Sequence, residues 1–118
     1  MYEVSFSDQS MSVLNQMDHI EQMKIVETIT NLNSYQLKNP DENVGVFKRE
    51  GKDFYRIRTG DIRIYFEARG KNQLYSHFIL HKNTMADFMF RCKLPLDNES
   101  AAEQDKGFWK YLEGLTRK

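Results

Sequence analysis

Four segments in which apolar and polar residues alternate follow one another between residues 44 and 81. They read VGVFKRE, DFYRIRT, IRIYFEA and QLYSHFIL, and short links that contain glycine separate them. An alternation with a period of two is typical of β-strands, and links this short join antiparallel neighbours. The sequence therefore predicts a four-stranded antiparallel sheet in the middle of the chain.

Helical patterns flank this sheet on both sides. Before it, apolar residues recur every three or four positions from Met11 to Leu32, which predicts two helices or one bent helix. A short strand at residues 2–6 precedes them, and Asn39-Pro40 ends the run. After the sheet we expect a short helix at about residues 84–92 and a final amphipathic helix. The expected fold is α+β, with helices on one face of an antiparallel sheet, namely an N-terminal two-helix segment packed on the sheet and C-terminal helices.

The chain of 118 residues is long enough for one domain with its own core. We expect residues 1–93 to form this domain and residues 94–118 to form a helical extension packed on it. Two alternatives remain open, in which the extension lies on a partner or partly shields the functional site. The extension is amphipathic because of five large side chains: Phe108, Trp109, Tyr111, Leu112 and Leu115.

The two-residue turn of the hairpin FYRIRTGDIRIYFEARG predicts its register. If residues 60–61 form the turn, Arg58 opposes Arg63 and Arg56 opposes Tyr65. These four side chains then share one face of the sheet, which we call the arginine face. The opposite face, which we call the apolar face, carries the side chains expected to pack on the helices: Tyr55, Ile57, Thr59, Ile62, Ile64 and Phe66.

Three arginines on one small area need an explanation, because facing like charges weaken a strand pair. One reading is a solvated sheet face whose arginines pair with Glu50, Glu67 or the acidic helical segment. The other reading, which we favour, is a phosphate site, because guanidinium groups bind phosphate oxygens bidentately. The neighbouring strands are expected to extend this patch with Lys48, Arg49 and Lys52 on one side and with Tyr75, His77, Ile79 and His81 on the other.

Charge is divided unevenly along a chain whose net charge is zero. Residues 1–43 hold two bases and seven acids, residues 44–93 hold eleven and five, and residues 94–118 hold four and five. A basic segment in a neutral protein favours a focused anion site over general nucleic-acid binding.

The sequence has no signal-peptide pattern and no long apolar run, and Cys92 is expected to be a small buried side chain. We therefore expect a cytoplasmic protein without a membrane span.

The string YRIRTGDIRIYFE, between a helical N-terminal segment and HFILHKN, resembles the RelE/ParE family of bacterial toxins. The similarity covers about residues 1–91. It implies the toxin of a type II toxin–antitoxin system, neutralised by a cognate antitoxin protein. RelE-like members cleave mRNA in the ribosomal A site without a metal or cofactor, whereas ParE-like members act on DNA gyrase.

For a RelE-like enzyme, the resemblance implies that Arg56, Arg58 and Arg63 contact phosphates. There they would stabilise the charge that develops as a ribose 2′-OH attacks the adjacent phosphorus. The loop LHKNTMADFMFR lacks the arginine that such enzymes carry after the last strand, and no tyrosine stands at the expected C-terminal place. Lys82 and Arg91 are the candidates to replace that arginine.

His81 is the first candidate for proton transfer, because histidine titrates near neutrality. Tyr65 and His77 are the next candidates. The expected catalytic residues are thus Arg56, Arg58, Arg63 and His81, and the expected substrate-binding residues are Lys48, Arg49, Lys52, Tyr65, His77 and Lys82.

The expected function is that of a translational repressor, a metal-independent mRNA endoribonuclease that acts on the ribosome. Its expected partners are a cognate antitoxin and mRNA on the ribosome. Two alternatives stay open. One is a ParE-like inhibitor of DNA gyrase, and the other is a non-catalytic family member that only binds antitoxin or DNA.

Overall fold

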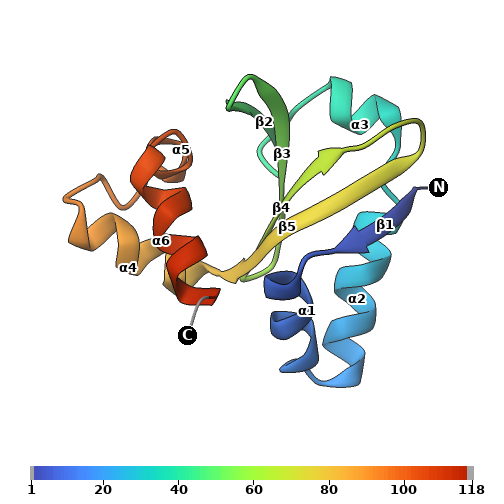
Figure 1. Cartoon of the computed structure of the whole chain (residues 1–118), viewed down its shortest axis with the longest axis horizontal. Helices are drawn as coiled ribbons and strands as arrows, with labels where there is room; N and C mark the ends of the chain where they lie inside the picture. The colour runs from blue at the N-terminus through green and yellow to red at the C-terminus, as the bar shows by residue number, and fades with distance from the viewer. Residues whose placement is uncertain (1, 117–118) are drawn as a thin grey trace.

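The computed structural model describes residues 2–116, apart from the side chains of Ser100, Leu115 and Thr116. Its centre is a five-stranded sheet with the strand order β1-β5-β4-β3-β2 (Figure 1). The predicted α+β class is confirmed. The elements in chain order are β1 (Glu3–Phe6), α1 (Asp8–Asn15), α2 (His19–Thr30), α3 (Ser34–Lys38), β2 (Val44–Arg49), β3 (Lys52–Thr59), β4 (Ile62–Ala68), β5 (Gln73–His81), α4 (Lys82–Arg91), α5 (Glu99–Glu103) and α6 (Lys106–Thr116).

The four predicted strands are β2 to β5, and each pairs with the next one in antiparallel fashion. The β3–β4 hairpin has the predicted register, with Arg58 opposite Arg63 and Arg56 opposite Tyr65. Gly60 in its turn has a φ of 59°, which glycine adopts without a steric penalty. The expectation of a purely antiparallel sheet is wrong, because β1 pairs in parallel with β5 at the edge.

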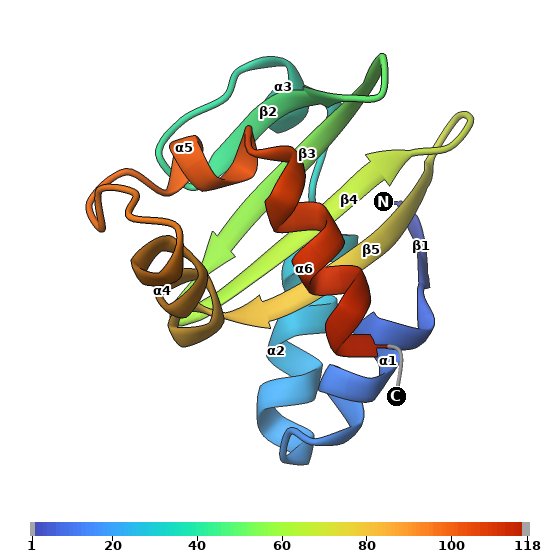
Figure 2. The ribbon, with the colours of Figure 1, turned by 60° about the vertical axis from the view of Figure 1, so that its left-hand side comes forward.

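Helices cover both faces of the sheet, although the sequence predicted helices on one face only. Helices α1 and α2 lie against the apolar face, and α4 to α6 lie on the opposite side, where α6 crosses in front of the sheet (Figure 2). The reason is that the arginine face is also largely apolar. The aromatic rings of Phe47 and Phe54 lie on it beside Trp109 of α6. An apolar sheet face has to be covered, so the chain folds back over it after β5.

Each face therefore has its own core. On the apolar face, side chains of α1 and α2 pack against β3 and β4, with Leu14, Ile25, Ile29, Ile57, Ile64 and Phe66 all buried. On the arginine face, Tyr65, Phe78 and Leu80 of the sheet pack against side chains of α4 and α6, namely Met85, Phe88, Met89, Phe108, Trp109 and Leu112.

A β-bulge in β5 changes which of its side chains face which layer. Tyr65 of β4 pairs with Phe78, but the next residue, Phe66, pairs with Ser76, which leaves His77 as the extra residue. Because of this extra residue, our prediction is wrong for the four positions beyond the bulge. The arginine face receives Phe78 and Leu80, and the apolar face receives Ile79 and His81.

Polar side chains at the start of α1 support this bulged part of β5, where β1 has already ended. Ser7 Oγ donates to the carbonyl of His77 at 2.6 Å. The side-chain amide of Gln9 donates to the carbonyl of Ile79 at 2.8 Å and accepts from its N–H at 2.9 Å. Unpaired backbone groups at a covered sheet edge are costly, so these bonds take over the role of a strand.

Cys92 is exposed, contrary to the prediction of a buried side chain. It follows the last residue of α4, where the chain leaves the packed layer. Among residues 2–116, no helix is both long enough and apolar enough to cross a membrane.

Candidate anion-binding site on the arginine face

Arg56 lies in the middle of β3 and is buried beneath α5. Its Nη1 donates to Glu103 Oε1 at 2.9 Å, and the Tyr65 hydroxyl donates to the other oxygen of this carboxylate at 2.7 Å. The side chains of Arg56 and Glu103 are only 7% and 4% exposed. Arginine does not give up its proton in proteins, so a buried guanidinium needs an anion beside it. Glu103 supplies that anion.

The backbone of β2 makes room for this guanidinium group. Gly45 is the cross-strand neighbour of Arg56, and a Cβ atom at Gly45 would lie 2.5 Å from Arg56 Nη2. Glycine is thus needed here for a close approach rather than for an unusual backbone conformation.

Arg63, near the start of β4, binds the other glutamate of α5. Its Nε and Nη2 donate to the two oxygens of Glu99 at 2.9 and 3.2 Å, which is a bidentate pair. Its Nη1 also donates to the carbonyl of Gly60 at 3.1 Å. The hydrogen bonds from Arg63 hold the pKa of Glu99 below its usual range, so this carboxylate is ionised at neutral pH.

Arg58 faces Arg63 across the hairpin and is the most accessible of the three guanidinium groups. Its side chain is 30% exposed, and its Nη2 lies 3.8 Å from Glu99 Oε2. Its Nη1 donates to the carbonyl of Glu42 at 3.4 Å. The carboxylate of Glu99 therefore lies near two opposed arginines, and this anion offsets the repulsion that the register predicts.

Arg49 of β2 extends this row of arginines. Its Nη2 forms an ion pair with Glu113 Oε1 of α6 at 3.0 Å. Its guanidinium group also lies over the rings of Trp109 and Phe54, at 5.0 and 5.5 Å from their centroids. Helices α5 and α6 thus provide a carboxylate for each of Arg49, Arg56, Arg58 and Arg63.

The arginine face is therefore not a solvated surface. The acids beside Arg56, Arg58 and Arg63 come from α5 and not from Glu50, Glu67 or the N-terminal helices. A guanidinium group binds carboxylate and phosphate through the same parallel N–H bonds. The glutamate oxygens consequently mark positions that phosphate oxygens can occupy.

Tyr65 is fully buried between Arg56 and the rings of α6. Burial raises the pKa of Tyr65 well above its usual range, and the Glu103 carboxylate beside it adds to the rise. The hydroxyl stays protonated at neutral pH. It can therefore donate a hydrogen bond or a proton to an anion, but it cannot accept a proton as a base.

His77 is at the bulge, on the arginine-face side of β5. Its Nε2 lies 2.9 Å from Glu67 Oε1, and its ring centroid lies 4.9 Å from that of Phe54. Burial lowers the pKa of His77, against the opposing effect of Glu67, so the ring is neutral at pH 7. A neutral imidazole can accept a proton.

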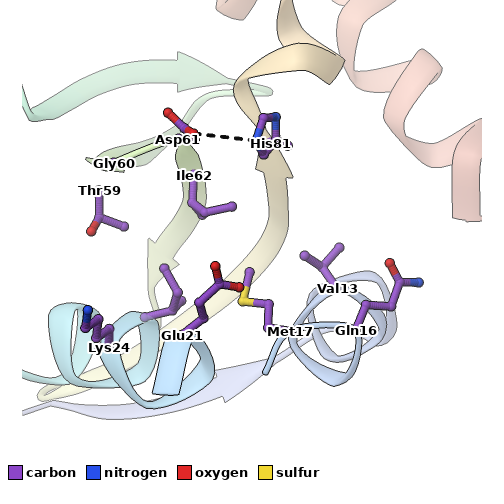
Figure 3. Close-up of a pocket in the computed structure, with 11 residues that line it drawn as sticks. Val13, Gln16, Met17, Glu21, Lys24, Thr59, Gly60, Asp61, Ile62 and His81 are labelled. Carbon is purple, nitrogen blue, oxygen red and sulfur yellow. Dashed lines mark ion pairs between the residues drawn. The ribbon is translucent and has the colours of Figure 1, made fainter. Parts of the chain in front are cut away.

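His81 lies on the other side of the sheet, although the sequence predicted it beside the arginines. It lines a pocket formed with α1, α2 and the β3–β4 turn, and its ring faces Asp61 (Figure 3). Its Nδ1 accepts from the N–H of Asn83 at 3.0 Å, and its Nε2 lies 3.8 Å from Asp61 Oδ2. His81 thus caps α4. Lys82 forms an ion pair with the same aspartate at 3.3 Å.

The two remaining predicted substrate-binding residues lie in the β2–β3 hairpin near its turn. Lys48 forms an ion pair with Asp53 at 2.6 Å, and both side chains are largely exposed. Lys52 is exposed at the start of β3. Neither lysine forms an ion pair with the glutamates of α5 or α6 in the described part of the chain.

Sequence reasoning did not identify the residues that close this site, which are Glu99, Glu103 and Glu113. Glu99 and Glu103 are four residues apart, so one side of a helix presents both. That spacing was a usable signal, but it does not indicate which surface the helix covers. Within residues 2–116, no group of three or more His, Cys, Asp or Glu side chains is placed to hold a metal ion.

The chain was compared with protein families, curated proteins and solved structures. No family model and no curated protein matches the chain. The chain is similar to one in the crystal structure of the toxin–antitoxin complex RelBE2 from Mycobacterium tuberculosis, with 16% sequence identity and a TM-score of 0.49. The similarity covers 68% of this chain and 96% of that chain.

The fit of Arg56 against β2 predicts that Gly45→Ala destabilises the protein. The added methyl group must displace a guanidinium that is buried and held by Glu103, so we expect a loss of about 1–3 kcal/mol in the free energy of unfolding. The matched control is Gly114→Ala in α6, where a Cβ meets nothing within 4 Å. This exchange should raise stability by roughly 0.5–1 kcal/mol, because glycine is a poor helix residue. Denaturant unfolding measures the change in the free energy of unfolding for both variants. If Gly45→Ala leaves the stability unchanged or raises it, as Gly114→Ala should, the packing described here for Arg56 is wrong.

The lowered pKa of Glu99 predicts a specific acid sensitivity. Because the pKa is lower in the folded state, the ion pair with Arg63 favours folding above the unfolded-state pKa, and this contribution is lost as the pH falls below about 5. The variant Glu99→Gln should therefore lose less stability than the wild type between neutral and acid pH, as measured by unfolding at several pH values.

A second carboxylate provides the control for this prediction. Burial opposes ionisation of Glu67, but hydrogen bonds from His77 and Arg69 lower its pKa overall. Glu67→Gln should thus remove a separate acid-sensitive contribution, and the effects of the two exchanges should add. If the stability of the wild type and that of Glu99→Gln depend on pH in the same way, the ion pair between Glu99 and Arg63 does not contribute as described.

Proposed function

We propose that this chain is a RelE-like toxin that cleaves mRNA on the ribosome, and that the arginine face is the phosphate-binding part of its active site. The observation that carries the proposal is the convergence of Arg58 and Arg63, from opposite strands, on the single carboxylate of Glu99. A phosphate group can take the same place, because arginine binds it with the same bidentate geometry. The proposed partners are mRNA on the ribosome and a cognate antitoxin.

In the proposed reaction, the 2′-oxygen of a ribose forms a bond to the adjacent phosphorus. The bond from phosphorus to the 5′-oxygen of the next nucleotide breaks. One proton leaves the 2′-hydroxyl for a base, and another reaches the departing 5′-oxygen. Negative charge increases on the non-bridging phosphate oxygens, where Arg56, Arg58 and Arg63 stabilise it electrostatically. This route uses no metal and no cofactor.

We assign the two proton transfers to Tyr65 and His77. The Tyr65 hydroxyl already donates to an anion that it shares with Arg56, which is the position required of a proton donor to the 5′-oxygen. The neutral ring of His77 can accept the proton of the 2′-hydroxyl. His81 lies on the other side of the sheet from these arginines, so we give it no step.

A second candidate function is that of a non-catalytic relative that only binds its antitoxin. The observation that favours it is the burial of Arg56 and Arg63 under α5, at 7% and 10% side-chain exposure. In this conformation, RNA reaches only the edge of the arginine face at Arg58.

The endoribonuclease proposal predicts a strong effect of Arg58→Ala. Purified protein is incubated with ribosomes carrying a defined mRNA, and the cut positions are mapped. We expect cuts within codons, at a rate roughly 10²–10³ lower for Arg58→Ala, the usual cost of removing one donor to a developing anion. Arg58 is the most accessible of the three arginines, so its loss should leave the fold intact. Lys71→Ala, at an exposed base in the β4–β5 turn, is the control and should cut like the wild type.

Three results would contradict the proposal in different ways. If the wild type and Arg58→Ala cut RNA at equal rates, the arginine face is not part of the active site. Inhibition of gyrase supercoiling without RNA cutting would favour the ParE-like alternative. If neither the wild type nor the variant Glu99→Gln/Glu103→Gln cuts RNA, inhibits gyrase or stops growth, the result favours the non-catalytic candidate.

A further inference from the structure

We propose that α5 is an intramolecular inhibitor that occupies the phosphate positions of the arginine face, so that RNA binds by displacing it. This inference rests on the proposed function, because it assigns the regulation of the same site. It concerns only α5, with Glu99 and Glu103, and leaves α6 in place on the sheet. Three observations support it.

The first observation is that α5 is attached to the sheet mainly through ions. Its polar contacts with the hairpin are those of Glu103 with Arg56 and Tyr65 and those of Glu99 with Arg63 and Arg58. Of its apolar side chains described, only Ala102 is fully buried. A polyanion offers the same arginines equivalent bonds, so exchanging one anion for the other costs little beyond the opening itself.

The second observation is that α6 has a different kind of attachment. Its Phe108, Trp109 and Leu112 are all at most 5% exposed in the core of the arginine face. The chain between α4 and α5 is irregular, and Leu96, Asp97 and Asn98 in it are exposed. On the other side, only residues 104–105 separate α5 from α6. Helix α5 can therefore leave the sheet while α4 and α6 keep their apolar packing, once the hydrogen bond that Trp109 Nε1 of α6 donates to the carbonyl of Glu103 at 3.1 Å is broken.

The third observation is that the glutamates do not satisfy the arginines completely. In the described part of the chain, Nε of Arg56 and Nε of Arg58 are buried and have no hydrogen-bond partner. Buried donors without partners are unfavourable. The phosphates of an RNA strand carry more acceptor oxygens than two carboxylates and can bind these donors as well. The arginine face thus has two donors that the glutamates of α5 leave without a partner and that a polyanion with more acceptor oxygens can bind.

Competition of this kind predicts that weakening α5 improves RNA binding. The probe is a short fluorescent RNA oligonucleotide, and its affinity for the full chain is measured by anisotropy at fixed salt concentration. We expect Glu99→Gln/Glu103→Gln to bind at least about tenfold more tightly than the wild type, because the open fraction of the site rises. RNA cutting on the ribosome should increase in parallel.

A charge-matched variant serves as the control. Asp97→Asn/Glu21→Gln removes two negative charges as well, but neither side chain contacts an arginine in the described residues. Its RNA affinity should stay within about twofold of the wild type. If this control binds RNA as tightly as Glu99→Gln/Glu103→Gln, the higher affinity comes only from the loss of two negative charges, and the proposal is wrong. Tighter binding without RNA cutting would refute the enzyme function but leave the inhibitory role of α5 intact.

A measurement on the wild type tests the proposal even if Glu103→Gln does not fold around the buried Arg56. Hydrogen exchange is followed with and without a saturating amount of the RNA oligonucleotide. Amides of residues 99–103 should exchange at least about tenfold faster when RNA is bound, whereas the amides of α6 should keep their protection. Unchanged or increased protection of residues 99–103 in the RNA complex would overturn the proposal.

Discussion

The ion pair between Arg56 and Glu103 joins the sheet to the chain that folds back over its arginine face. Arg56 is on the central part of the sheet, and its guanidinium group remains charged at any pH the protein meets. Its side chain is only 7% exposed, so the region cannot simply stay hydrated. A layer that covers the apolar part of this face must therefore bring a carboxylate to Arg56. Helix α5 does so in the conformation described, through Glu103.

The bulge at His77 has a matching role in the apolar part of the same layer. It turns Phe78 and Leu80 toward the arginine face, where they join Tyr65 in the core that α4 and α6 complete. Without this inversion, two apolar side chains would leave that core and the arginines would dominate the face. The bulge thus makes it possible for one face to hold both a packed core and a row of charges.

The parts of the structure that the sequence predicted are those governed by local rules. A two-residue turn sets the pairing of its strands, so Arg58 and Arg63 could be placed opposite each other. An extra residue within an alternating strand leaves no comparable trace, and every position after His77 was therefore assigned to the wrong face. The contact of Glu103 with Arg56 joins residues far apart in the chain. Their complementary charges are visible in the sequence, but many other pairings are equally compatible with it.

The pairing of arginine with glutamate also bears on whether the contact is a permanent part of the fold. A buried ion pair contributes little net stability, and apolar side chains of similar size often serve a packed interface as well or better. Packing alone thus does not account for arginines at positions 56, 58 and 63 beneath a short helix. The proposed displacement of α5 by a negatively charged ligand would account for them, because the same guanidinium groups would then bind a carboxylate in one state and a phosphate in the other. The two Nε atoms without a partner agree with this view, since each can donate to a further acceptor.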